Sequence, residues 1–209
     1  MVNGLRLFWV KSLRQSWPAY FLVLLFFILG VAAGTYGVEK LRAEQVQELG
    51  LYLDRFLQQA GMIEVDASKA MREALYNDMT TVLAVYLLGL TVIGVPVMLG
   101  LLFARGFVLG FTIHFLAREK NVEGVILACA AILPQNIFLV PALLMGGVAS
   151  LSFSLLLGRR FFNTKVQVWP SFVVYSGFML LIAACFAGAV LVEVYLTPLL
   201  VRLAAHYMF

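Results

Sequence analysis

Two histidines and a few serines are the residue types in this sequence that most often carry chemistry. His114 and His206 have no HExxH or comparable metal-ligand spacing around them, and no GxSxG elbow precedes a helix. The serines within apolar runs are Ser150, Ser152, Ser154 and Ser176. A serine in an apolar helix usually bonds to a carbonyl one turn back or to a neighbouring helix. The sequence therefore predicts no catalytic residue, no metal site and no cofactor.

The longest apolar run is interrupted by its most polar residues, Gln135 and Asn136, which follow Leu133 and Pro134. Proline removes a backbone donor, so we predict a broken or strongly tilted helix here. Unwound backbone at membrane depth exposes carbonyls and amides that hold substrates in transporters. The interpretation that we favour is that the Gln135 and Asn136 amides satisfy the groups that Pro134 frees and link neighbouring helices.

Carboxylates are expected to lie outside the membrane interior. Carriers coupled to protons or sodium usually place an acidic residue near the middle of the bilayer. No Asp or Glu falls in the middle of an apolar run in this sequence. A transporter or permease subunit with its site at residues 134–136 is therefore the alternative function, not the first.

Composition identifies the surroundings in which these residues must be positioned. Hydrophobic residues make up 63% of the 209 residues and charged residues only 12%, which is far outside the range of a water-soluble domain. The net charge of +4 does not come from a basic patch with interleaved aromatic residues, so nucleic acid is not an expected partner. The chain is predicted to be an all-α, polytopic membrane helix bundle in contact with the lipid bilayer.

Apolar runs predict a single integral membrane domain over residues 1–209. The runs are residues 20–38, 80–103, 106–117, 124–158 and 172–192. The first is expected to be an uncleaved membrane helix, because it is long for a signal peptide. The third is too short to cross alone, and Arg105 is expected to end the second. These runs give about five transmembrane helices.

Lysine and arginine set the expected orientation, because short cytoplasmic loops are enriched in them. With the amino terminus inside, the basic residues of that face are Arg6, Lys11, Arg14, Arg105, Arg159, Arg160 and Lys165. For Arg105 and Arg159 to share this face, the chain between them must cross an even number of times. The expected topology then has a cytoplasmic amino terminus and an external carboxy terminus.

Residues 39–78 form the one long polar segment, with eight acidic and five basic residues. Apolar residues near a 3.6-residue period predict an amphipathic helix that ends near Gly61. Asp66 or Ser68 can cap a second helix, so we expect an external helical hairpin. If its second helix continued to Phe103, it would be about 55 Å long and would project beyond the membrane.

The first helix of this hairpin carries a candidate docking face. Leu49, Tyr52 and Phe56 recur along one side of it. An amphipathic helix that stands off the membrane can present such a stripe to a partner domain. The other interpretation is that these side chains pack against the second helix of the same hairpin.

Glycine pairs indicate close helix packing. Gly30 and Gly34 fit the GxxxG pattern, and so do Gly106 and Gly110. Glycines at this spacing let two helix backbones approach each other. They predict a compact bundle or a homodimer.

At several of these positions the chain resembles the stage II sporulation protein M family. The shared features are Gly94-Val95-Pro96, residues 105–111, residues 133–136 with Pro141, and Glu193 followed by Thr197-Pro198. The resemblance extends over essentially the whole chain. Its most specific part is the Leu-Pro-Gln-Asn element.

The resemblance implies a multi-pass protein of the cell membrane, located in the mother-cell septal and engulfing membrane of a sporulating cell. It also implies a non-enzymatic scaffold that anchors stage II sporulation proteins D and P, which remodel peptidoglycan. The family has no established catalytic residues, so none is carried over. An intramembrane enzyme is the least supported function, because the residues that it requires are not found.

Overall fold

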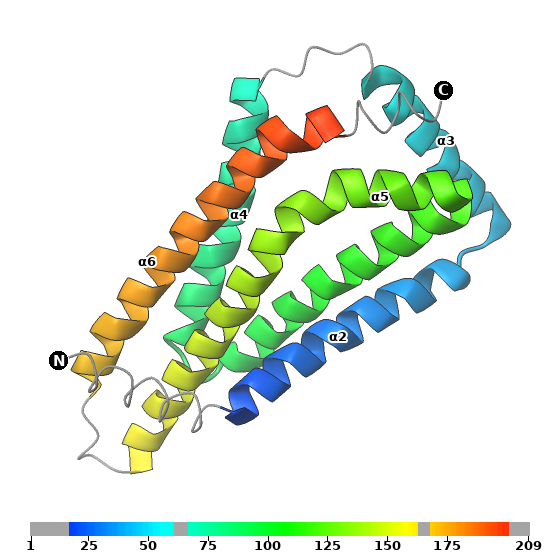
Figure 1. The fold of residues 1–209 in the computed structure, drawn as a ribbon. Coiled ribbons are helices and arrows are strands. Elements are labelled where there is room, and N and C mark those ends of the chain that lie inside the picture. Colours follow the sequence, from blue (N-terminus) through cyan, green and yellow to red (C-terminus); the bar gives the residue numbers. More distant parts are fainter. Residues whose placement is uncertain (1–16, 61–66, 163–167, 201–209) are drawn as a thin grey trace.

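The computed structural model of the chain describes residues 17–60, 67–162 and 168–200. These residues form helices, and no strand occurs among them, which confirms the all-α fold. The elements are α2 (Trp17–Glu39), α3 (Ala43–Ala60), α4 (Ala67–Gly89), α5 (Gly94–Phe162), α6 (Trp169–Leu191) and the π-helix η1 (Val192–Leu196). Figure 1 shows that the long helices form one elongated bundle, with α3 at one end of it.

Three of the described helical stretches are long and apolar enough to cross a membrane. They are Trp17–Glu39, Gly94–Arg160 and Trp169–Leu200. The first and last contain the apolar runs predicted to be the first and last crossings. The chain is therefore a membrane protein by length and composition of its helices, whereas the number of five crossings stays a prediction.

The long helix α5 folds back on itself at Asn121. This residue has φ 52° and ψ −126°, and asparagine tolerates a positive φ better than most residues. Residues 94–120 form a first arm and residues 122–162 a second arm that returns beside it (Figure 1). Gly124 lies directly against the Leu116 carbonyl, where a Cβ would not fit. The two arms are therefore packed closely from the turn onward.

The predicted crossing over residues 80–103 is wrong, because the chain reverses inside it. α4 ends at Gly89 and α5 begins at Gly94. The Gly94 N–H donates to Thr91 Oγ1 over 3.1 Å, which caps the start of α5. Pro96 lies in the first turn of α5, where its missing N–H has no helical partner to lose. The continuous 55 Å helix is thus also wrong.

The predicted separate segment over residues 106–117 is wrong for a related reason. These residues belong to the uninterrupted first arm of α5, which begins twelve residues before Gly106 and continues past Ala117. Arg105 lies within that arm. It does not mark the end of a helix, so it no longer contributes to the orientation of the chain.

The last carbonyls of α4 have hydrogen-bond partners from other helices. Ser150 Oγ donates to the Val85 carbonyl over 3.0 Å, and Tyr175 Oη donates to the Tyr86 carbonyl over 2.9 Å. The Leu87 and Leu88 carbonyls accept the N–H groups of Leu90 and Thr91 in the chain reversal itself. A helix end inside an apolar bundle requires such partners, because no water is there to replace them.

Ser154 extends the same pattern into the reversal. Its Oγ donates to the Thr91 carbonyl over 2.8 Å, and the Ser176 hydroxyl lies 3.0 Å from Tyr86 Oη. The interpretation of the membrane serines as bonds between neighbouring helices is therefore confirmed for Ser150, Ser154 and Ser176. These hydroxyl groups hold the reversal in place.

The second arm of α5 is not broken at Pro134. It keeps helical dihedral angles through Pro134 and Pro141, and it curves without leaving the helical conformation (Figure 1). Pro134 has no N–H, so the Ala130 carbonyl loses its usual helical partner. Asn136 Nδ2 does not replace that partner, because it donates to the Ile132 carbonyl over 2.8 Å. Neighbouring helices keep a membrane helix regular despite one lost bond, so the predicted break is wrong.

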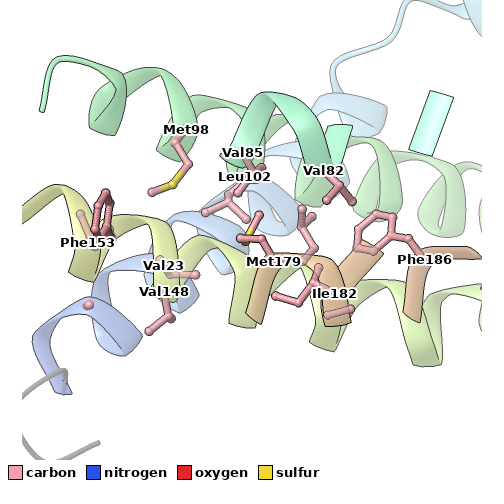
Figure 2. Close-up of a cluster of buried hydrophobic side chains, with 14 of the residues drawn as sticks. Val23, Val82, Val85, Met98, Leu102, Val148, Phe153, Met179, Ile182 and Phe186 are labelled. Atoms are coloured by element: carbon pink, nitrogen blue, oxygen red, sulfur yellow. The ribbon is translucent and has the colours of Figure 1, made fainter. Parts of the chain in front are cut away.

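Side chains from four helices meet in one buried hydrophobic cluster (Figure 2). It includes Val23 of α2, Val85 of α4, Leu102 and Val148 of the two arms of α5, and Phe186 of α6. Lipid tails are as apolar as these side chains, so close packing is what holds them together. The cluster fixes the helices that carry the polar groups described next.

Candidate functional site

Helix α2 and the first arm of α5 contact each other through their backbones. Four glycines lie where a Cβ would clash with a carbonyl of the opposite helix: Gly30, Gly34, Gly106 and Gly110. Gly34, for example, faces the Phe107 carbonyl, and Gly110 faces the Val31 carbonyl. The two GxxxG pairs are thus partners of each other within one chain. They do not form the face of a homodimer, which stays a prediction for other surfaces.

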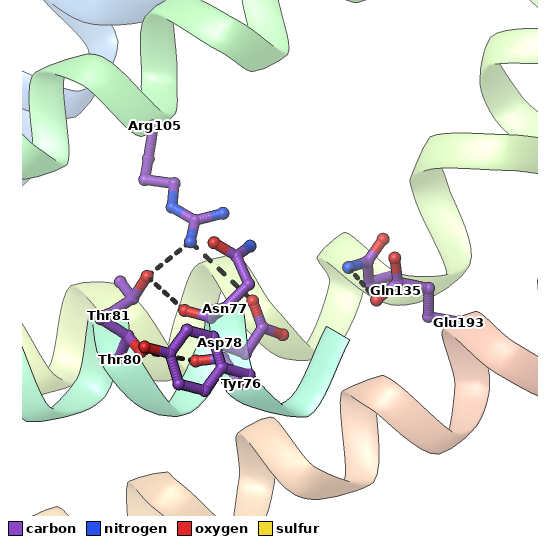
Figure 3. Close-up of polar contacts among 8 residues, drawn as sticks. All are labelled: Tyr76, Asn77, Asp78, Thr80, Thr81, Arg105, Gln135 and Glu193. Carbon is purple, nitrogen blue, oxygen red and sulfur yellow. Dashed lines mark hydrogen bonds and ion pairs between the residues drawn. The ribbon is translucent and has the colours of Figure 1, made fainter. Parts of the chain in front are cut away.

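A polar cluster joins α4, both arms of α5 and η1 (Figure 3). We call Asp78, Arg105, Gln135 and Glu193 the charge cluster. Arg105 Nη2 lies 3.8 Å from Asp78 Oδ1 and donates to Thr81 Oγ1 over 2.6 Å. Gln135 Nε2 donates to Glu193 Oε2 over 2.7 Å. The cluster therefore connects segments that lie far apart in the sequence.

The reversal between α4 and α5 explains why Asp78 and Arg105 meet. Asp78 precedes Gly89 by eleven residues, and Arg105 follows Gly94 by eleven residues. Each distance corresponds to about 16 Å along a helix axis. Because the two helices run in opposite directions from the reversal, both side chains reach the same level of the bundle.

Two carboxylates lie within the bundle, although α4, which carries Asp78, is not one of the membrane-length stretches, so the expectation about the membrane interior stays a prediction. Asp78 is only 2% exposed, and its Oδ2 atom has no hydrogen-bond partner among the described residues. Glu193 is half-buried in η1, inside the apolar stretch Trp169–Leu200. One sequence signal was available, since the chain stays apolar for several residues after Glu193.

A cavity of about 180 Å³ lies beside Arg105, between α2 and the two arms of α5. Its polar lining residues are Arg105, Thr112, Gln135 and Asn136, and the rest of its wall is apolar. A space of this size holds a few water molecules or a small ligand. Two of the three residues predicted at the helix break, Gln135 and Asn136, border it, whereas Pro134 does not.

The predicted docking residues lie on α3, away from the charge cluster. Tyr52 is 76% exposed and Leu49 is half-buried, while the side chain of Phe56 lies outside the described residues. Leu53 packs against a small buried group at the turn of α5 that includes Leu116, and Gly50 faces the Glu119 side chain. These contacts place α3 on α5, whereas the hairpin interpretation had expected it to pack on α4.

Comparison with protein families now identifies the chain. The model of the stage II sporulation protein M family matches residues 23–198. The chain belongs to this family. The matched region includes the glycine interface, the charge cluster and α3, and the resemblance noted from the motifs is confirmed. Comparison with curated proteins and with solved structures gave no match.

Family membership makes this a sporulation-related membrane protein. The family is not known as a family of enzymes. Within the described part of the chain, no three His, Cys, Asp or Glu side chains gather in a group that could hold a metal ion. Two regions are candidate binding sites: the exposed face of α3 for a partner protein, and the charge cluster with its cavity for a small ligand.

Proposed function

We propose that the protein is a non-enzymatic scaffold that holds peptidoglycan-remodelling proteins at the engulfing membrane of a sporulating cell. The observation that carries this proposal is the family match over residues 23–198. The proposed partners are stage II sporulation proteins D and P, and the proposed location is the mother-cell septal and engulfing membrane. The protein contributes an anchored surface to this assembly, and the partners contribute the chemistry.

Helix α3 supports the proposal, because it presents apolar side chains outside the three membrane-length stretches. Leu51 and Tyr52 are exposed on it. Leu53 packs against the buried residues at the turn of α5. A preorganised surface loses little conformational freedom when a partner binds, which favours affinity.

The distribution of basic residues supports an external position for α3. Arg159 and Arg160 lie near the end of α5, and Figure 1 shows this end beside the start of α2, at the opposite end of the bundle from α3. Short cytoplasmic segments are enriched in basic residues. We therefore place that end in the cytoplasm, with α3 on the side that faces the cell wall.

Co-purification with the two partners tests the proposal. The full chain is co-expressed with stage II sporulation proteins D and P and extracted in mild detergent. Tyr52→Ala is compared with Tyr76→Ala, because both tyrosines are 76% exposed and only Tyr52 lies on α3. We expect the first substitution to lower partner recovery about tenfold, as a central aromatic contact does, and the second to leave it unchanged.

Two results of this experiment would contradict the proposal at different levels. If the unsubstituted chain recovers neither partner, the scaffold function is wrong. If both tyrosine variants recover the partners as well as the unsubstituted chain does, the scaffold function stands but α3 is not the docking face.

A transporter or permease subunit is the second candidate, and the cavity beside Gln135 and Asn136 is the observation that favours it. The regular helix at Pro134 counts against it, because no unwound backbone is available there to hold a substrate. Reconstituted vesicles would test this function. A solute flux that Gln135→Ala and Asn136→Ala both abolish would replace the scaffold proposal.

A further inference from the structure

The charge cluster contains one more carboxylate than it contains cations. Arg105 Nη2 lies 3.8 Å from Asp78 Oδ1, and η1, which carries Glu193, packs against both α4 and α5. Asp78, Arg105 and Glu193 belong to α4, the first arm of α5 and η1. Two ionised carboxylates and one guanidinium sum to a charge of minus one. An uncompensated charge of this kind is strongly unfavourable inside a membrane protein.

Asp78 shows where compensation is lacking. Its Oδ1 atom is 3.8 Å from Arg105 Nη2, which is longer than a hydrogen bond. Its Oδ2 atom has no hydrogen-bond partner in the described part of the chain, and the residue is almost completely buried. Figure 3 shows the Asp78 carboxyl group between Arg105 and the pair formed by Gln135 and Glu193. Arg105 therefore neutralises the cluster only in part.

Glu193 provides the second carboxylate from an unusual piece of backbone. It lies in η1, a π-helix over Val192–Leu196. Such segments are rare and occur frequently at functional sites. Gln135 donates a hydrogen bond to Glu193 Oε2, which orients the carboxylate without adding charge. The cavity is bordered by Arg105 and Gln135, the two residues that contact Asp78 and Glu193.

We propose that the protein binds one small monovalent cation, a proton or an alkali metal ion, between the carboxyl groups of Asp78 and Glu193. Carboxylate oxygens bind protons, and hard metal cations prefer oxygen atoms as ligands. A single positive charge makes the cluster neutral. The bound cation links α4 to η1, so its binding stabilises the bundle. This site is independent of the partner surface on α3.

Thermal unfolding of the full-length protein in nanodiscs of zwitterionic lipid tests the proposal. In one arm, the pH is lowered from 8 to 5 in choline chloride at constant ionic strength. In the other arm, sodium or potassium replaces choline at pH 7. At concentrations of the binding cation above its dissociation constant, we expect the Tm to rise by about 3–5 °C for each tenfold increase in that concentration. The arm that shows the rise distinguishes a proton from an alkali metal ion.

Variants assign the response to the cluster. Asp78→Asn and Glu193→Gln each remove one of the two carboxylates, and we expect both to abolish the cation dependence. Glu44→Gln is the matched control, because it removes an exposed carboxylate on α3 and should keep the wild-type response. Glu193→Gln retains an oxygen that accepts from Gln135, so it carries the test if Asp78→Asn does not fold.

The proposal is overturned by either of two results. One is a Tm of the unsubstituted protein that changes with pH and with alkali metal ions no more than the Tm of Glu193→Gln does. The other is a Glu193→Gln variant that responds to both cations as the Glu44→Gln control does. Partner recovery is not measured in this experiment, so its outcome does not depend on the scaffold function.

Discussion

The two sides of the first arm of α5 are joined to their neighbours in opposite ways. Toward α2, Gly106 and Gly110 have no side chain, so the two backbones touch there, and the polar bond from Arg118 to the Val38 carbonyl lies farther along the arm. Toward α4, Arg105 extends a long side chain to Asp78 and Thr81. Arg105 and Gly106 are adjacent in the sequence, yet one serves a polar contact and the other a contact without polar side chains.

The difference reflects how helices associate where lipid provides no hydrophobic driving force. Close packing of small residues and hydrogen bonds between helices are the two available sources of affinity. The glycine interface depends on volume, because any added atom meets a backbone carbonyl. The charge cluster depends on charge balance. Substitutions at the two sides should therefore fail for different reasons, and the following predictions use that difference.

The largest effect is expected from Gly106→Ala. A Cβ here would clash with the Phe27 carbonyl, and backbone cannot move aside as a flexible side chain can, so we expect a loss of about 3 kcal/mol of stability. Gly100→Ala in the same arm is the control, because nothing lies within 4 Å of its Cβ position. That substitution should stabilise the helix by up to about 1 kcal/mol. Thermal unfolding in detergent measures both, and changes of the same sign would contradict the glycine interface.

The next largest effect is expected from Arg105→Met. It leaves the buried Asp78 carboxylate without its cationic neighbour, which should destabilise the protein by about 2 kcal/mol. Adding Asp78→Leu to the same chain should restore most of the stability, because the pair is then replaced by apolar side chains. A double variant no more stable than Arg105→Met alone would show that Arg105 acts through contacts other than Asp78.

A smaller effect is expected from Tyr175→Phe, which tests polar bonds that carry no charge. The substitution removes the donor to the Tyr86 carbonyl at the end of α4 and should cost about 1 kcal/mol. Tyr86→Phe is its counterpart, because the Tyr86 hydroxyl contacts only Ser176 in the described structure and caps no carbonyl. It should cost about half as much. Equal losses in unfolding experiments would indicate that capping of α4 contributes nothing.

The smallest effect is expected from Pro134→Ala. The second arm is already helical at this position, so restoring one N–H should change stability by less than about 1 kcal/mol. Circular dichroism should show unchanged helix content. A large gain in helix content would mean that the arm is interrupted at Pro134 after all.

Local patterns in the sequence predicted the helices that depend only on neighbouring residues. The first apolar run lies within α2, and the amphipathic helix expected to end near Gly61 is α3, which ends at Ala60. Periodicity and run length contain this information directly. The glycine pairs likewise indicated close packing, although the sequence could not show that each pair contacts the other.

The reversal between α4 and α5 could not be predicted from run length, because residues 80–103 contain no charged residue. The groups that stabilise it, Ser150, Ser154 and Tyr175, come from helices far along the chain. Thr91 and Pro96 were local signals of a helix start, but residues 80–103 were interpreted as one crossing. Because the reversal was not predicted, the start of α5 at Gly94 and its cap by Thr91 were not predicted either.

The charge cluster was missed because charged residues usually mark the ends of membrane helices. Arg105 was interpreted in this way, and Asp78 was assigned to the polar hairpin. The two meet only because the chain reverses between them. Gln135 was identified as a polar contact between helices, but its partner Glu193 is 58 residues away, and no local pattern relates the two.

The position of α3 on the turn of α5 has a mechanical consequence. A pull exerted on α3 by a wall-bound protein would enter both arms of α5 together at their shared turn, through Leu53 and Gly50. One arm passes the load to α2 across the glycine contacts, and the other passes it toward α6. Tension on a single small helix would thus be shared by the entire bundle, as the proposed scaffold function would require.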